Sequence, residues 1–195
     1  MLLNGKMPDG AKKRADALTA LLFLGIMCFD QFVVALPYEN VVFPLLAIAA
    51  LEAGFCANVA LIGGYSLIFE LSCVAWMPTD IFRVSKWLVA VFIGYSMTYL
   101  LVKATKKSDR ENGVLGIAVY ATVGEILYYW VSVAATCVIW RVPFVAYLTS
   151  DLPYEIAGAA ATFLCALPIA FIYKKLSRRN AEKRSSAIAE RAARG

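Results

Sequence analysis

Apolar stretches of about 20 residues recur along this chain, and charged residues or proline separate them. A stretch of that length spans the hydrocarbon layer of a membrane when it folds as a helix, and helix formation satisfies its backbone polar groups internally. Hydrophobic residues make up 61% of the 195 residues and charged residues only 17%, which is unusual for a soluble domain. We therefore expect an all-α integral membrane protein.

The stretches predict a bundle of six transmembrane helices. They cover residues 17–36, 41–55, 58–76, 84–102, 114–140 and 153–173. The second and third helices come from one long apolar block, which we divide near Gly54 because Glu52 and Asn58 flank that position. An even number of spans places both chain ends on the same side of the membrane.

Basic residues gather in three segments. The N-terminal tail, the 103–111 loop and the C-terminal tail hold 16 of the 19 lysines and arginines. Six spans put all three segments on one face, which the positive-inside rule assigns to the cytoplasm, whereas five spans would separate the N-terminal tail from the others. We expect cytoplasmic N and C termini, with a tail over 1–16, a membrane domain over 17–176 and a basic tail over 177–195 near anionic lipid.

Four acidic residues lie within the expected spans: Asp30, Glu52, Glu70 and Glu125. An ionisable side chain costs about 2.5–3.5 kcal/mol at the centre of a membrane helix, so it usually faces the bundle interior or a wet cavity. In the expected topology Asp30 and Glu70 lie in the outer half and Glu125 near the middle. We expect these three to converge on a region that opens outward, with Glu52 in the inner half.

Aromatic side chains lie at the same level as these acids. Tyr129 and Trp130 follow Glu125 by about one helical turn, and an aromatic face beside a carboxylate suits a flat, polar or cationic small molecule. Interhelical hydrogen bonds and an interfacial aromatic belt would explain the same residues without a ligand. The candidate binding residues are Glu125, Trp130, Tyr129, Glu70, Asp30, Trp140, Arg141 and Asp151.

Several activities are excluded by what the sequence lacks. It contains no histidine, which removes His-bound metals and Ser-His nucleophiles, and it contains no Gly-rich phosphate loop. Its five cysteines lie singly in apolar stretches, as buried structural thiols do. The basic residues lack the interleaved aromatics of a nucleic-acid surface. We expect no enzyme, metal, cofactor or nucleic-acid partner.

Three short motifs of low specificity make the chain similar to a known family. The first helix opens with Ala15-Asp-Ala-Leu-Thr-Ala20, the second contains Phe43-Pro-Leu-Leu-Ala-Ile before a third with Gly63-Gly64, and the last opens with Ser150-Asp-Leu-Pro-Tyr-Glu-Ile-Ala157. With its six expected helices and basic ends, the chain resembles the substrate-binding S component of energy-coupling factor (ECF) vitamin transporters.

The resemblance implies high-affinity capture of a vitamin or related heterocycle in a pocket under the loop between helices one and two. It further implies a multi-pass protein of a bacterial plasma membrane, docked to a transmembrane coupling subunit and two ATPase subunits, which would hydrolyse ATP. Small residues of helix one would form the docking surface, here Ala11, Ala15 and Ala20. Only Ala11 and Ala15 have the family's four-residue spacing, since Leu21 follows Ala17 at that distance.

Other functions compete with solute uptake. A multipass scaffold, similar to the rod-shape-determining membrane proteins of bacteria, would use the intramembrane acids for packing alone. A membrane enzyme is a third alternative, because paired carboxylates can bind a metal and a lipid phosphate, but no acid spacing typical of such enzymes occurs. Among solutes, the acids favour a thiamine-like or purine-like compound, while Arg83, Lys86 and Arg141 leave an anionic vitamin open.

Overall fold

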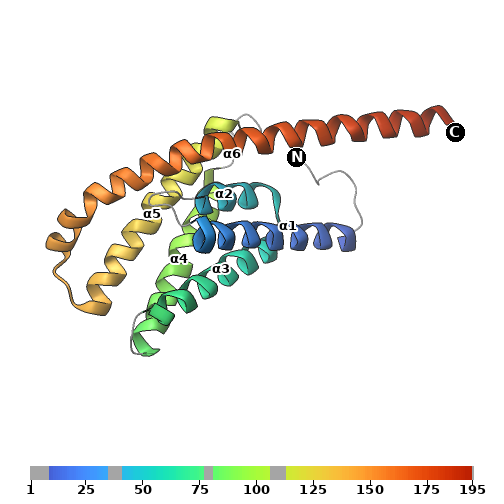
Figure 1. Ribbon diagram of the computed structural model, residues 1–195. Helices are drawn as coiled ribbons and strands as arrows, with labels where there is room; N and C mark the ends of the chain where they lie inside the picture. The colour runs from blue at the N-terminus through green and yellow to red at the C-terminus, as the bar shows by residue number, and fades with distance from the viewer. Residues whose placement is uncertain (1–8, 35–40, 77–80, 106–112, 195) are drawn as a thin grey trace.

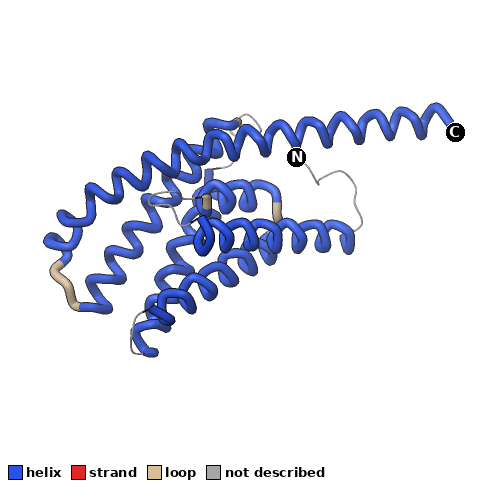
Figure 2. Tube along the Cα trace, viewed as in Figure 1, coloured by secondary structure: helices blue, strands red, loops and turns tan. Residues whose placement is uncertain are grey.

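The computed structural model describes residues 9–34, 41–76, 81–105 and 113–194 of the chain. Within these ranges the chain is helical apart from short connections, as Figure 2 shows, and none of the described residues forms a strand. The expected all-α class is confirmed.

Six α-helices and one π-helical turn make up the described chain. The first half contains α1 (Asp9–Phe29), which runs directly into η1 (Asp30–Val34), followed by α2 (Val42–Glu52) and α3 (Phe55–Trp76). The second half contains α4 (Ile81–Thr105), α5 (Val114–Trp140) and α6 (Phe144–Arg194).

The first and last helices are longer than the apolar stretches that predict them. α1 begins at Asp9 and not at residue 17, and α6 is a single helix of 51 residues that includes the expected span 153–173. α6 begins after Pro143, whose carbonyl accepts a hydrogen bond from the Tyr147 amide. Both extensions are rich in alanine and charged residues with high helix propensity, so they stay helical where hydropathy is low.

Four helical segments are long and apolar enough to cross a membrane: Asp9–Val33, Phe82–Thr105, Val114–Trp140 and Phe144–Glu182. These segments indicate a multi-pass membrane protein. By contrast α2 has 11 residues, and its length of about 16 Å is roughly half of the hydrocarbon thickness. In the described residues, the expected second span 41–55 is therefore a half-length helix.

α2 forms the centre of the bundle. Every residue from Val42 to Leu51 is buried, and the helix contacts α1, α3, α4, α5 and α6. A helix that is apolar on all sides is stable only when neighbours cover all of its faces. The long helices therefore surround a short, fully buried core helix.

Two polar side chains shape the corner between α2 and α3. The backbone N–H of Gly54 donates a hydrogen bond to Asp16 Oδ2 in α1 at 3.0 Å. The buried side-chain amide of Asn58 donates to the carbonyl oxygens of Ala49, Ala53 and Gly54, each at 3.1 Å. The carbonyls of Ala49 and Gly54 also accept backbone hydrogen bonds from the amides of Ala53 and Asn58. Together these bonds hold the corner at which the apolar block divides.

Consecutive helices run in opposite directions (Figure 1). The start of α1 and the end of α6 lie at the same end of the bundle, and the last part of α6 projects well beyond the other helices. At that end the Tyr173 hydroxyl of α6 donates a hydrogen bond to Glu52 Oε1 of α2. Glu52 therefore has a structural contact that ties the central helix to α6.

Candidate functional site

Carboxyl groups of α5 and α6 come together where these two helices pack. Glu125 and Tyr129 lie one turn apart on α5, and Asp151 and Glu155 lie one turn apart on α6. Glu155 lies three residues before Gly158, the α6 residue whose backbone lies next to the Glu125 carboxylate. We call Glu125, Tyr129, Asp151 and Glu155 the acidic cluster.

Glu125 is the most deeply placed member of the acidic cluster. Its side chain is 9% exposed, and its Oε1 atom lies 3.1 Å from the position that a Cβ atom would take on Gly158 of α6. Any larger residue at position 158 would press on the carboxylate. The absence of a side chain on Gly158 thus gives the Glu125 carboxylate its place between the two helices.

Two further polar atoms of the acidic cluster are also withdrawn from solvent. The Tyr129 hydroxyl and Glu155 Oε1 are buried and have no hydrogen-bond partner among the residues that the structure describes. Buried polar atoms of this kind are costly unless a partner satisfies them. A ligand that donates hydrogen bonds or carries positive charge would satisfy both atoms.

A cluster of tyrosines lies on another face of α5, where that helix packs against α4. Tyr95 of α4 and Tyr128 of α5 stack at 4.6 Å between ring centroids, and Tyr65 of α3 meets Tyr95 edge-on at 5.3 Å. Phe43 of α2 packs against both Tyr95 and Tyr128. We call these four residues the tyrosine cluster. Since Tyr128 and Tyr129 are adjacent, the two clusters share the same turn of α5.

Gly94 and Gly124 bring α4 and α5 close enough for the tyrosine cluster to form. A Cβ atom on Gly94 would lie 2.6 Å from the Tyr128 ring, and one on Gly124 would overlap the Thr98 side chain. Both glycines are therefore required by a close approach, and the helix pair gains packing from it.

Asp30 belongs to the surroundings of the tyrosine cluster. It lies in η1 next to Gln31, whose Oε1 accepts a hydrogen bond from the Tyr65 hydroxyl at 3.4 Å. Glu70 lies in α3, but its side chain is outside the described part of the structure. The expected convergence of Asp30, Glu70 and Glu125 therefore stays a prediction, while the Glu125 carboxylate lies against Gly158 of α6.

The aromatic candidates take different positions. Tyr129 joins the acidic cluster, whereas Trp130 is 46% exposed on the bundle surface and contacts Tyr129 edge-on. Trp140 meets Trp87 edge-on at 5.3 Å, an arrangement typical of an interfacial aromatic belt. Arg141 ends α5 in a left-handed conformation with φ of 56° and is exposed.

The small residues expected to dock a partner differ in exposure. Ala11 is exposed and Ala15 is half-buried, whereas Ala20 belongs to the hydrophobic core of the bundle. Ala20 therefore packs within the chain. The exposed face of α1 consists mainly of larger apolar residues, among them Leu18 and Leu22.

Glu155 and Tyr147 are the residues that the sequence prediction of the site omitted. Tyr147 lies one turn before Asp151 on α6. The signal was the four-residue spacing of Tyr147, Asp151 and Glu155, which places all three on one face of a helix. That face could have been identified from the sequence once α6 was expected to begin before residue 147.

Clustered carboxylates can also form a metal centre. Within the described residues, no group of three or more histidine, cysteine, aspartate or glutamate side chains is arranged to hold a metal ion.

Comparisons of the chain with known protein families, with curated proteins and with solved structures found no match in any of the three.

Proposed function

We propose that the chain binds a small organic solute carrying positive charge or several hydrogen-bond donors, as the substrate-specific subunit of an ECF-type importer. The observation that carries this proposal is the acidic cluster, in which the Glu125 carboxylate is buried against Gly158 of α6. Glu155 Oε1 and the Tyr129 hydroxyl are buried there without a hydrogen-bond partner among the described residues. Buried acidic groups are costly, and a bound cation or hydrogen-bond donor would offset that cost. Neighbouring carboxylates are an unfavourable choice for packing alone.

Aromatic groups favour a heterocycle as the solute. Tyr129 follows Glu125 by one turn on α5, and Tyr147 precedes Asp151 by one turn on α6. Tyrosines offer flat apolar faces together with hydroxyl groups, which suits a thiamine-like or purine-like compound. Cation–π attraction to these rings would add to the attraction of the carboxylates.

The arrangement of charge along the bundle supports cytoplasmic termini. The basic residues of α1 lie at the end of the bundle where α6 projects, and the acidic cluster lies toward the opposite end, near the start of α6 (Figure 1). The positive-inside rule then orients the acidic cluster toward the outside of the cell, where a solute would arrive. Uptake would depend on partner subunits that bind ATP, since this sequence contains no phosphate loop.

A scaffold without a ligand is the second candidate. Its supporting observation is that two other acids of the bundle have structural partners: Asp16 accepts a hydrogen bond from Gly54 and Glu52 accepts one from Tyr173. Exposed apolar residues on α1 and α6, such as Leu22 and Phe171, would then contact other membrane proteins. Ligand binding separates the two candidates.

The test is a thermal-shift screen of the purified chain with thiamine, adenine and the anionic vitamin biotin, combined with native mass spectrometry for solutes retained from the cell. We expect a compound of this panel that is cationic or rich in hydrogen-bond donors to stabilise the protein. Glu125→Gln and Asp151→Asn should weaken that effect, while Glu182→Gln, an exposed position in the projecting part of α6, should leave it unchanged. Absence of any retained solute and of any shift across the panel would favour the scaffold.

A further inference from the structure

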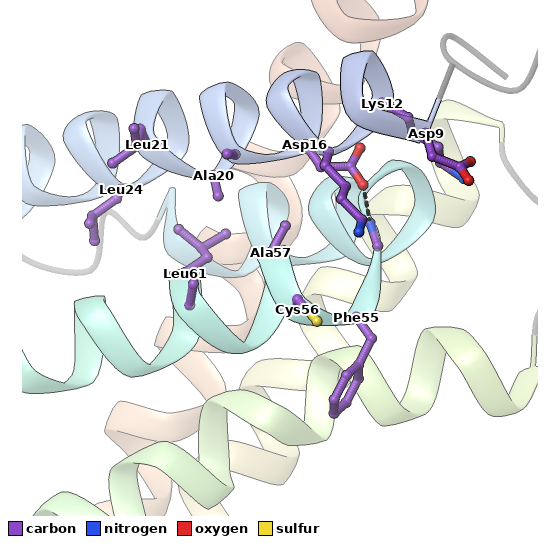
Figure 3. A pocket seen from close by; sticks show the side chains of 14 residues that line it. Asp9, Lys12, Asp16, Ala20, Leu21, Leu24, Phe55, Cys56, Ala57 and Leu61 are labelled. Atoms are coloured by element: carbon purple, nitrogen blue, oxygen red, sulfur yellow. Dashed lines mark hydrogen bonds between the residues drawn. The ribbon is translucent and has the colours of Figure 1, made fainter. Parts of the chain in front are cut away.

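A groove of about 800 Å³ lies between the first half of α1 and the start of α3, far along the bundle from the acidic cluster. Most of its wall is apolar and made of small side chains, including Ala17 and Ala20 of α1 and Ala57 and Ala60 of α3. Figure 3 shows these two helices side by side, with Leu24 and Leu61 further along the groove. Such a slot fits a flexible hydrocarbon chain.

The other end of the groove is charged. Asp9, Lys12, Lys13 and Asp16 line it, all within the first two turns of α1. Both signs of charge thus occur at the point where the apolar part of α1 begins. This is the level at which lipid headgroups meet a membrane helix.

Asp16 has an acceptor atom at this end of the groove that the protein does not use. The side chain is 8% exposed, and Oδ2 accepts the hydrogen bond from the Gly54 amide. Oδ1 is buried and has no hydrogen-bond partner within the described ranges of the chain. Figure 3 shows the carboxylate between α1 and the start of α3. A buried carboxylate oxygen in this state favours a charged N–H donor as its partner.

We propose that the groove binds a phospholipid with a primary ammonium headgroup, of the ethanolamine type. The acyl chain would lie along the alanine-lined wall, the phosphate would pair with Lys12 and Lys13, and the ammonium would donate to Asp16 Oδ1. A phosphatidylglycerol headgroup would keep the phosphate contact with the lysines but has no ammonium to donate to Asp16 Oδ1. A choline headgroup has no N–H to donate. The proposal is independent of the solute and of transport.

The test is native mass spectrometry of the full chain in detergent with three lipids of identical acyl chains: phosphatidylethanolamine, phosphatidylcholine and phosphatidylglycerol. We expect the ethanolamine lipid to be retained about tenfold more than the other two, as expected for one charge-assisted hydrogen bond. Asp16→Asn can still accept from Gly54 and should remove the preference over choline. The double variant Lys12→Ala, Lys13→Ala changes only exposed side chains and should lower retention of all three lipids.

A variant that fills the groove with a larger side chain tests whether the lipid binds there. Ala17→Phe should reduce retention of the ethanolamine lipid, whereas Ala134→Phe, an exposed alanine of α5, should not. Equal retention of the ethanolamine and choline lipids by the wild type, or a preference for phosphatidylglycerol, would overturn the proposed headgroup. Unchanged lipid retention in both the lysine variant and Ala17→Phe would show that the lipid does not bind in the groove. The groove would then be a binding surface for a protein partner.

Discussion

The carboxylate of Asp16 accepts a hydrogen bond at 3.0 Å from the backbone amide of Gly54, 38 residues further along the chain. This bond joins α1 to the corner between α2 and α3. Glycine is required at the corner, because a Cβ atom on Gly54 would lie 3.0 Å from the same carboxylate oxygen. A residue expected in a cytoplasmic tail thus fixes the position of the central helix.

Removal of this bond should destabilise the protein. Asp16→Ala leaves the Gly54 amide without its acceptor, and the loss should be about 1–2 kcal/mol in the free energy of unfolding, as for other helix-capping residues. Asp16→Asn keeps a hydrogen-bond acceptor, so its loss in the free energy of unfolding should be smaller. Thermal unfolding in detergent measures both, with the exposed Asp9→Ala as control. Equal unfolding temperatures for Asp16→Ala and Asp9→Ala would show that the bond contributes no stability.

Asn58 should be more sensitive than Asp16. Its side-chain amide is buried and is shared among three carbonyl oxygens at the end of α2 and the start of α3. Asn58→Ala should cost about 1–3 kcal/mol, and Asn58→Asp more, because it places acceptors against acceptors. The comparison is the exposed Asn180→Ala in α6, measured by the same unfolding assay. If Asn58→Asp unfolds at the wild-type temperature, the corner does not depend on these bonds.

Helices and their ends could be predicted from local sequence patterns, whereas contacts between distant residues could not. The helix over 114–140 is confirmed to the residue, because Gly113 precedes it and Pro143 follows it closely. The break near Gly54 was also expected. The two side chains that hold it could not be assigned, since the contact between Asp16 and Gly54 depends on how α1 packs.

Prediction of the candidate site from the sequence was limited in the same way. Spacing placed Tyr129 beside Glu125, because residues four apart share a helix face. Spacing could not show that α6 covers that face, nor that Trp130 turns toward the bundle surface. A one-residue step on a helix rotates the side chain by about 100°, so Tyr128, Tyr129 and Trp130 face three different surroundings.

Substitution of Gly124 should disrupt the packing of α4 against α5. The new methyl group of Gly124→Ala would overlap the Thr98 side chain, which is fully buried, and overpacking of this kind costs about 1–3 kcal/mol. Gly25→Ala on α1 is the matched control, because no atom lies within 4 Å of its Cβ position. It should be neutral or stabilising, since alanine is the better helix former. Similar losses for both variants would contradict close packing at Gly124.

The bond between Tyr173 and Glu52 should appear as a coupling energy. Each of Tyr173→Phe and Glu52→Gln removes or weakens the same hydrogen bond between α6 and α2. We expect the double variant to be less destabilised than the sum of the single variants, by about 0.5–3 kcal/mol. A double-mutant cycle from unfolding measurements gives this value. Additive effects would show that the two residues act independently.

Within the proposed binding site, Tyr129 and Trp130 should differ although they are neighbours. Tyr129→Phe removes a buried hydroxyl that has no hydrogen-bond partner among the described residues, so it should weaken binding of the best solute of the thermal-shift panel by about tenfold. Trp130→Ala changes a side chain that is 46% exposed and should leave affinity within about twofold, because exposed positions couple weakly to a buried site. Titration calorimetry on the two variants measures both constants. The reverse order, with Trp130→Ala the more damaging, would move the binding site from the α5 and α6 interface to the bundle surface.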